Sequence, residues 1–160
     1  MNLLLEILFL LTLGVLFYQD ITERKVSIWI LIIGIFLGGL IHYWHQPQIV
    51  FFSNIGVNSI FIALIFGTLW VYAKLKLKKR IFEVFGMGDL FFFILLAVSL
   101  PILSFLILFV FSLIFSLLIF ILLKNTFKEK TVPLAGLQSL FLSLVLIANK
   151  FLITIDIYAL

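Results

Sequence analysis

Apolar runs long enough to cross a lipid bilayer recur along this whole chain, and they leave little room for anything except membrane helices. Hydrophobic residues make up 65% of the 160 residues and charged residues only 11%, whereas a soluble domain carries about 25% charged residues. About 20 consecutive apolar residues cross the hydrocarbon core as one α-helix. Because every connector between the runs is short, the sequence predicts an all-α, polytopic membrane helix bundle that forms a single domain over residues 1–160.

A proline decides how many spans the bundle has. As one helix, the stretch from Asp89 to Leu123 would measure about 52 Å, far more than a bilayer core of about 30 Å. Pro101 lies within this stretch, and proline cannot continue the hydrogen-bond ladder of a helix. We therefore expect a hairpin there and about six transmembrane helices in all. The predicted spans cover residues 3–19, 28–43, 55–73, 88–100, 102–123 and 133–155.

The basic residues gather in three connectors, and a six-span topology places all three on one side. The positive-inside rule makes this side cytoplasmic and puts both termini outside, in a cell (inner) membrane. The same clustering excludes nucleic acid as the reason for the net charge of +4 and predicts contact with anionic lipids of the bilayer. The connector residues are Arg24, Lys25, Lys74, Lys76, Lys78, Lys79, Arg80, Lys124, Lys128 and Lys130.

Two aspartates lie at the predicted cytoplasmic boundary, Asp20 at the end of the first span and Asp89 at the start of the fourth. Two neighbouring carboxylates cannot both ionise cheaply, so they share one proton. The ionised member can then take a proton from water while the protonated member polarises a carbonyl, which is aspartic peptidase chemistry. Taken singly, Asp89 also suits a helix N-cap and Asp20 an interfacial charge. Their common depth and side favour the pair.

Three short motifs resemble those of one family of membrane peptidases. The residues GMGD at 86–89 match the GxGD pattern of membrane aspartic peptidases. The residues YQD at 18–20, followed by a basic pair and a valine, resemble the first-aspartate motif of the type IV prepilin peptidases. The residues TVPLAGL at 131–137 resemble that family's proline- and glycine-containing entry into the last span. The three matches occur in the family's order and cover essentially the whole chain.

The resemblance implies a concrete activity. Members of this family are endopeptidases that remove the short basic leader of prepilin-like proteins at the cytoplasmic membrane boundary, in type IV pilus assembly or protein secretion. The chain has no cysteine and no room for the N-methyltransferase domain of bifunctional members, so it resembles the peptidase-only form. No metal or cofactor is implied. The resemblance makes Asp20 and Asp89 the catalytic pair, supported by the motif residues Gly86, Gly88, Pro133 and Gly136.

Two departures from the family pattern accompany the matches. Phe91 stands where the family usually has a lysine, and Ser27 and Ile28 stand where it usually has proline and asparagine. The helix dipole also predicts an asymmetric pair, because Asp89 begins a helix and Asp20 ends one. We expect Asp20 to be the protonated partner at rest and Asp89 the ionised one.

Two other function classes fit a chain of this kind. A small proton-coupled transporter or channel subunit would use intramembrane carboxylates as a relay, and a non-catalytic membrane assembly factor would tolerate Asp→Asn changes. His42 and His45 have a spacing that could bind a metal, but their aromatic neighbours favour an interfacial belt at the outer surface. Glu6 is predicted to be solvated near that surface, and Lys150 to extend toward it.

Overall fold

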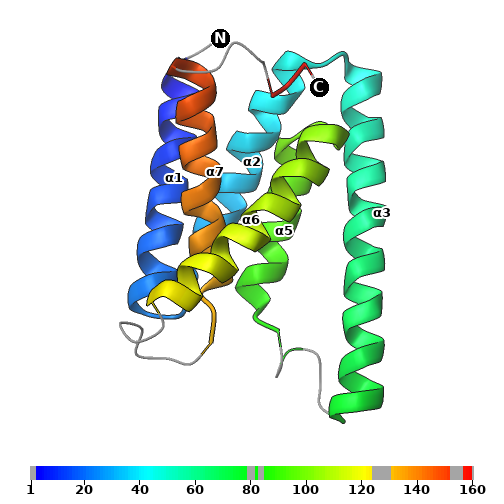
Figure 1. The fold of residues 1–160 in the computed structure, drawn as a ribbon. Coiled ribbons are helices and arrows are strands. Elements are labelled where there is room, and N and C mark those ends of the chain that lie inside the picture. Colours follow the sequence, from blue (N-terminus) through cyan, green and yellow to red (C-terminus); the bar gives the residue numbers. More distant parts are fainter. Residues whose placement is uncertain (1–2, 79–81, 83–84, 124–130, 152–156, 160) are drawn as a thin grey trace.

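All regular structure in the described part of the chain is helical. The computed structural model describes residues 3–78, 82, 85–123, 131–151 and 157–159. The α-helices in these residues run alternately up and down, and the start of α1 and the end of α7 lie at the same end of the bundle (Figure 1). The predicted all-α bundle is thereby confirmed. Its helices are α1 (Leu3–Thr22), α2 (Ile28–His45), α3 (Gln48–Tyr72) with its π-helical continuation η1 (Ala73–Leu77), α5 (Met87–Ser99), α6 (Ile102–Leu123) and α7 (Leu134–Phe151).

Four of the helices have the length of membrane helices, and apolar side chains cover their outer surfaces. Four are long and apolar enough to cross a membrane, namely α1, α2, α3 with η1, and α6, while α5 and α7 are apolar but shorter. Large apolar side chains lie on outer surfaces, where Trp29 is 77%, Ile49 85% and Leu122 76% exposed. Exposed apolar surface on this scale requires an apolar surrounding. The last predicted span continues to residue 155, and its end lies outside the described residues.

The break predicted at Pro101 is confirmed. Helix α5 ends at Ser99, and Leu100 has an extended backbone, with φ −132° and ψ 145°. This is the conformation that a residue before proline favours. The next helix begins at Ile102, and the Phe105 N–H donates to the Pro101 carbonyl at 2.7 Å. Helix α5 is therefore only about 20 Å long. The position of its C-terminus in the bundle thus determines how deep its first turn lies.

Buried side chains from two other helices complete the C-terminus of α5. The Asn58 amide Nδ2 donates to the carbonyls of Ala97 and Leu100, at 2.9 Å each. The His42 Nδ1 lies 2.8 Å from the Val98 carbonyl. The last carbonyls of a helix have no partner within the helix, and an unpaired carbonyl is costly where water is absent. These contacts therefore anchor the end of α5 to α2 and α3.

The connector predicted between the second and third spans is much shorter than expected. Helix α3 begins at Gln48, not near residue 55, and Asn54 is buried inside the bundle rather than in a loop. Its Nδ2 lies 3.2 Å from the His42 Nε2, and His42 is fully buried. His42 therefore belongs to the packed interior and not to an exposed aromatic belt, because both of its ring nitrogens contact other helices. His45 instead stacks on the Tyr158 ring, with centroids 4.2 Å apart.

The core brings the two ends of the sequence together. It includes Phe9 and Leu13 of α1, Leu31 of α2, Leu95 of α5 and Leu142 of α7. Figure 1 shows α1 and α7 lying side by side, with α3 at the opposite edge of the bundle. The end of α1, the start of α5 and the start of α7 consequently meet at one end of the bundle.

Candidate active site

Asp20 and Asp89 lie together at the first turn of α7. Asp20 belongs to the last turn of α1 and Asp89 to the first turn of α5. The Gly136 N–H donates to Asp20 Oδ2 at 2.6 Å. The Ala135 N–H donates to Asp89 Oδ1 at 2.9 Å. Because these two N–H groups are consecutive, the two carboxylates are neighbours.

The start of α7 is suited to hold two carboxylates. The first N–H groups of a helix have no intrahelical partner, and Pro133, immediately before α7, has no N–H of its own. The Pro133 carbonyl accepts the Leu137 N–H at 3.0 Å, which begins the helical ladder. The positive end of the helix dipole favours negative charge at this point. The carboxylates of α1 and α5 thus cap a third helix.

Glycines provide the space that this arrangement needs. A Cβ on Gly136 would lie 2.8 Å from the Asp20 Cβ and 3.0 Å from its Oδ2. A Cβ on Gly86 would lie 2.9 Å from the Asp89 Oδ2, and one on Gly88 would lie 3.3 Å from the Val26 Cβ. Any side chain at residue 136 would therefore displace Asp20 from the helix terminus.

The pair is buried, and its charges interact. Asp20 is 8% exposed. The two carboxylates repel each other electrostatically, while Arg24 attracts Asp20. Arg24 lies where the chain leaves α1 and has a left-handed backbone, with φ 54°. That conformation is uncommon for a residue with a side chain, so the turn holds this positive charge close to the pair.

The prediction that Asp20 is protonated and Asp89 ionised considered only the helix to which each aspartate belongs. Asp20 does end its own helix, but it also accepts the shorter of the two hydrogen bonds from the start of α7. Both carboxylates therefore meet a helix N-terminus, which favours the anion of either. The position of each aspartate in its own helix cannot distinguish the acid from the base.

An open cavity of about 840 Å³ surrounds the pair. Both aspartates line it, together with the α1–α2 connector, the segment before α5 and the segment before α7. Aromatic and basic side chains lie beside the carboxylates, so an extended peptide could be held over the pair. The lining residues are Asp20, Arg24, Lys25, Val26, Phe82, Phe85, Gly86, Met87, Gly88, Asp89, Thr131, Val132 and Leu134.

Phe91, at the position where type IV prepilin peptidases usually have a lysine, does not line this cavity. It is half-buried and packs against the hydrophobic core. Sequence reasoning missed the amide of Ala135 as the partner of Asp89, although the proline at residue 133 marked a helix start. Of the basic connector residues, Lys79, Arg80, Lys124, Lys128 and Lys130 lie outside the described residues.

The described residues contain no group of three or more His, Cys, Asp or Glu side chains that could hold a metal ion. Comparison with models of protein families, with curated proteins and with solved structures found no match to this chain.

Proposed function

We propose that this chain is a membrane aspartic endopeptidase that cleaves the basic leader of prepilin-like proteins, with Asp20 and Asp89 as its catalytic pair. The observation that carries the proposal is the attachment of both carboxylates to consecutive amides at the start of α7. That attachment engages one oxygen of each carboxylate. The Gly86 backbone also hydrogen-bonds to the Asp89 carboxylate, so Asp20 Oδ1 is the oxygen that remains for a water molecule and a shared proton.

The chemistry follows from the repulsion between the two acids, which favours one shared proton. The ionised carboxylate takes a proton from water, and the oxygen of that water adds to the scissile carbonyl carbon. The protonated carboxylate donates its proton to the carbonyl oxygen. The resulting tetrahedral diol collapses as the C–N bond breaks, and the leaving nitrogen receives the proton that was taken from water. As the carbonyl re-forms, one hydroxyl of the diol returns its proton to the carboxylate that had donated one, so both carboxylates are back in their starting states.

The orientation of the pair suits a leader that lies in the cytoplasm. Arg24 and Lys25 follow α1, and Lys74 and Lys76 lie in η1, at the aspartate end of the bundle (Figure 1). The positive-inside rule places this end at the cytoplasmic face of a cell membrane. A substrate whose apolar helix is embedded in the bilayer would present the peptide bond before that helix at the depth of the pair.

The deciding experiment is co-expression with a prepilin-like protein that has a basic leader, a glycine and then an apolar helix. Asp20→Asn and Asp89→Asn should each stop leader removal while the enzyme still accumulates in the membrane. Glu23→Gln is the matched control, because Glu23 is an exposed acid that does not line the cavity. Continued cleavage in both aspartate variants would falsify the proposal. It would favour a non-catalytic assembly factor instead.

A further inference from the structure

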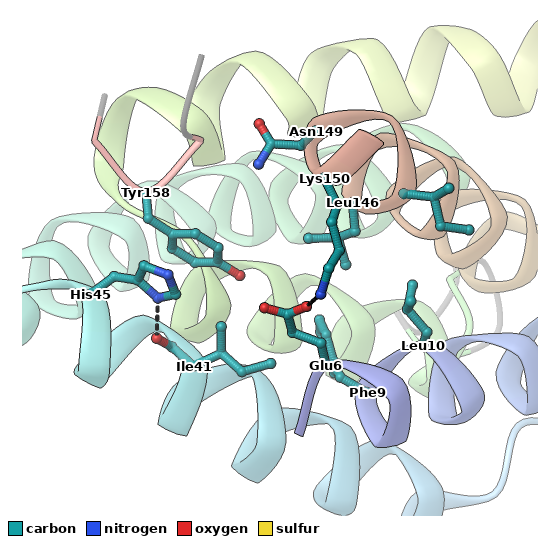
Figure 2. A pocket seen from close by; sticks show the side chains of 10 residues that line it. Glu6, Phe9, Leu10, Ile41, His45, Leu146, Asn149, Lys150 and Tyr158 are labelled. Carbon is teal, nitrogen blue, oxygen red and sulfur yellow. Dashed lines mark hydrogen bonds and ion pairs between the residues drawn. The ribbon is translucent and has the colours of Figure 1, made fainter. Parts of the chain in front are cut away.

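Helix α7 is attached to α1 near both of its ends. At its start, the Gly136 N–H donates to Asp20. Near its other end, Lys150 and Glu6 form an ion pair beside a cavity of about 240 Å³, which corrects the expectation that each is simply solvated. Figure 2 shows the two side chains extending toward each other. This pair holds α7 only weakly, because Lys150 is 39% exposed and exposed ion pairs contribute little stability.

A buried amide attaches another side of α7 to α6. Gln138 lies two positions after Gly136, which is about 200° around the helix, so the two residues face different neighbours. The Gln138 Nε2 donates to the Ser112 Oγ of α6 at 3.0 Å, and both side chains are buried. The Ser112 hydroxyl in turn donates to the Phe109 carbonyl at 2.8 Å. Its oxygen is thereby oriented to accept from the amide.

The amide occupies a position where an apolar side chain would be less costly. Gln138 Oε1 is buried and has no hydrogen-bond partner among the described residues, and an unmet buried acceptor lowers stability. A polar residue in an apolar helix interface fixes the register of the helices at a cost in stability. The reason is that a hydrogen bond is directional, whereas apolar contacts allow helices to slide and rotate. Gln138 therefore has the properties of a residue that sets the position of α7.

We propose that Gln138 is a positioning residue for the aspartate pair. Its hydrogen bond to Ser112 fixes the rotation and depth of the first two turns of α7. These turns carry the Ala135 and Gly136 N–H groups, and each group holds one carboxylate. A rotation of α7 would move both groups relative to α1 and α5, so the carboxylates would lose their alignment. That this loss slows cleavage rests on the proposed function, whereas the displacement of the carboxylates does not.

The test compares Gln138→Met with the unaltered protein, both purified in detergent. Methionine is unbranched and of similar length, but it cannot donate the hydrogen bond. Leader cleavage should lose about tenfold or more in kcat, while KM should stay nearly the same because neither Gln138 nor Ser112 lines the cavity of the pair. The midpoint of unfolding should also stay nearly the same, since the unmet acceptor is lost together with the hydrogen bond. The carboxyl infrared bands of the pair, assigned by their loss in Asp20→Asn and Asp89→Asn, should shift.

Ser112→Ala removes the same hydrogen bond from the α6 side and should reproduce both the loss in kcat and the band shift. Ser116→Ala is its matched control, since Ser116 is equally buried on α6 but donates within its own helix, to the Ser112 carbonyl. It should change neither measurement. The double variant Gln138→Met with Ser112→Ala should lose no more kcat than the weaker of its two single variants, because both changes remove one interaction.

The role of Gln138 and the proposed function can fail separately. If the unaltered protein cleaves and Gln138→Met keeps its kcat and its carboxyl bands, Gln138 does not position the pair. Equal losses in Ser112→Ala and Ser116→Ala would also overturn the proposal, because they would indicate a general packing defect in α6. If the unaltered protein cleaves no leader, the proposed function fails. The band shifts then decide by themselves whether Gln138 positions the carboxylates.

Discussion

Asp20 and Asp89 are joined through a single peptide segment of α7, since the Gly136 N–H donates to one and the preceding Ala135 N–H to the other. The two acids come from α1 and α5, and neither helix positions the other's aspartate directly. The depth and rotation of α7 therefore determine how far apart the carboxylates lie. Changes at the start of α7 should affect both acids at once.

Gly136→Ala is expected to damage the site more than any other change of similar size. The new Cβ would meet the Asp20 Cβ at 2.8 Å, and forcing a methyl group into such a contact costs about 1–3 kcal/mol of stability. Leader cleavage should fall at least about a hundredfold, because misplacement of reacting groups by about 1 Å has effects of that size. Thermal unfolding in detergent and a cleavage assay measure the two effects.

Gly14→Ala is the matched control, because it lies on α1 with Asp20 and a Cβ there would meet nothing within 4 Å. Its stability should stay the same or rise by up to about 1 kcal/mol, since alanine favours a helix more than glycine does. If Gly136→Ala had the same stability and cleavage rate as Gly14→Ala, this would contradict the close approach of α1 and α7 at the aspartate pair.

Gly86→Ala should reduce activity with little loss of stability. The nearest atom to the new Cβ is Asp89 Oδ2, at 2.9 Å, which is the end of a side chain that can rotate. Rotation relieves the contact but turns the carboxylate away from its position at Ala135. We expect the free energy of unfolding to stay within about 0.5 kcal/mol of that of the unaltered protein. The cleavage rate per folded molecule should fall strongly. A fully active Gly86→Ala protein would argue against a requirement for this Asp89 geometry.

Asn58→Leu should destabilise the bundle while leaving the aspartates in place. It removes both hydrogen bonds to the end of α5 and leaves the Ala97 and Leu100 carbonyls without them. A cost of about 1–3 kcal/mol is expected, measured as a lower midpoint of unfolding. Ser59→Ala, at the exposed neighbouring position, is the control and should change stability little. Equal effects of the two changes would mean that the amide does not support α5.

Phe91→Lys introduces the residue that type IV prepilin peptidases usually have at this position, but it should not raise the proposed cleavage activity. Phe91 packs against the core and does not line the cavity of the pair, so the ammonium would replace apolar contacts and lose hydration. We expect a loss of about 1–3 kcal/mol of stability and no gain in cleavage per folded molecule. An increased cleavage rate at unchanged stability would place the side chain of residue 91 in the site after all.

Several features of the fold could be read from local sequence. The apolar runs predicted the helical class, and Pro101 predicted the break between α5 and α6, because a missing N–H disrupts the helical hydrogen bonds locally. The order of the runs also placed Asp20 and Asp89 at the same end of the bundle. Helix starts were predicted less well, since Asn54 was assigned to a connector although it is buried in α3. A polar residue such as Asn54 suggests a loop in the sequence, because its buried hydrogen-bonding partner, here His42, becomes known only from the structure.

The sequence by itself determined which segments are helical, where α5 stops and which end of the bundle holds the aspartates. Only the tertiary structure decided that the first turn of α7 joins the two acids, through a hydrogen bond between residues 116 positions apart. It also decided that Glu6 pairs with Lys150 and that His42 belongs to the core. The physical reason is that these helices are apolar on nearly every face. They lack the amphipathic pattern that would mark the buried side of a helix in a soluble protein. Which face of each helix is buried therefore depends on its contacts with helices that are distant in the sequence.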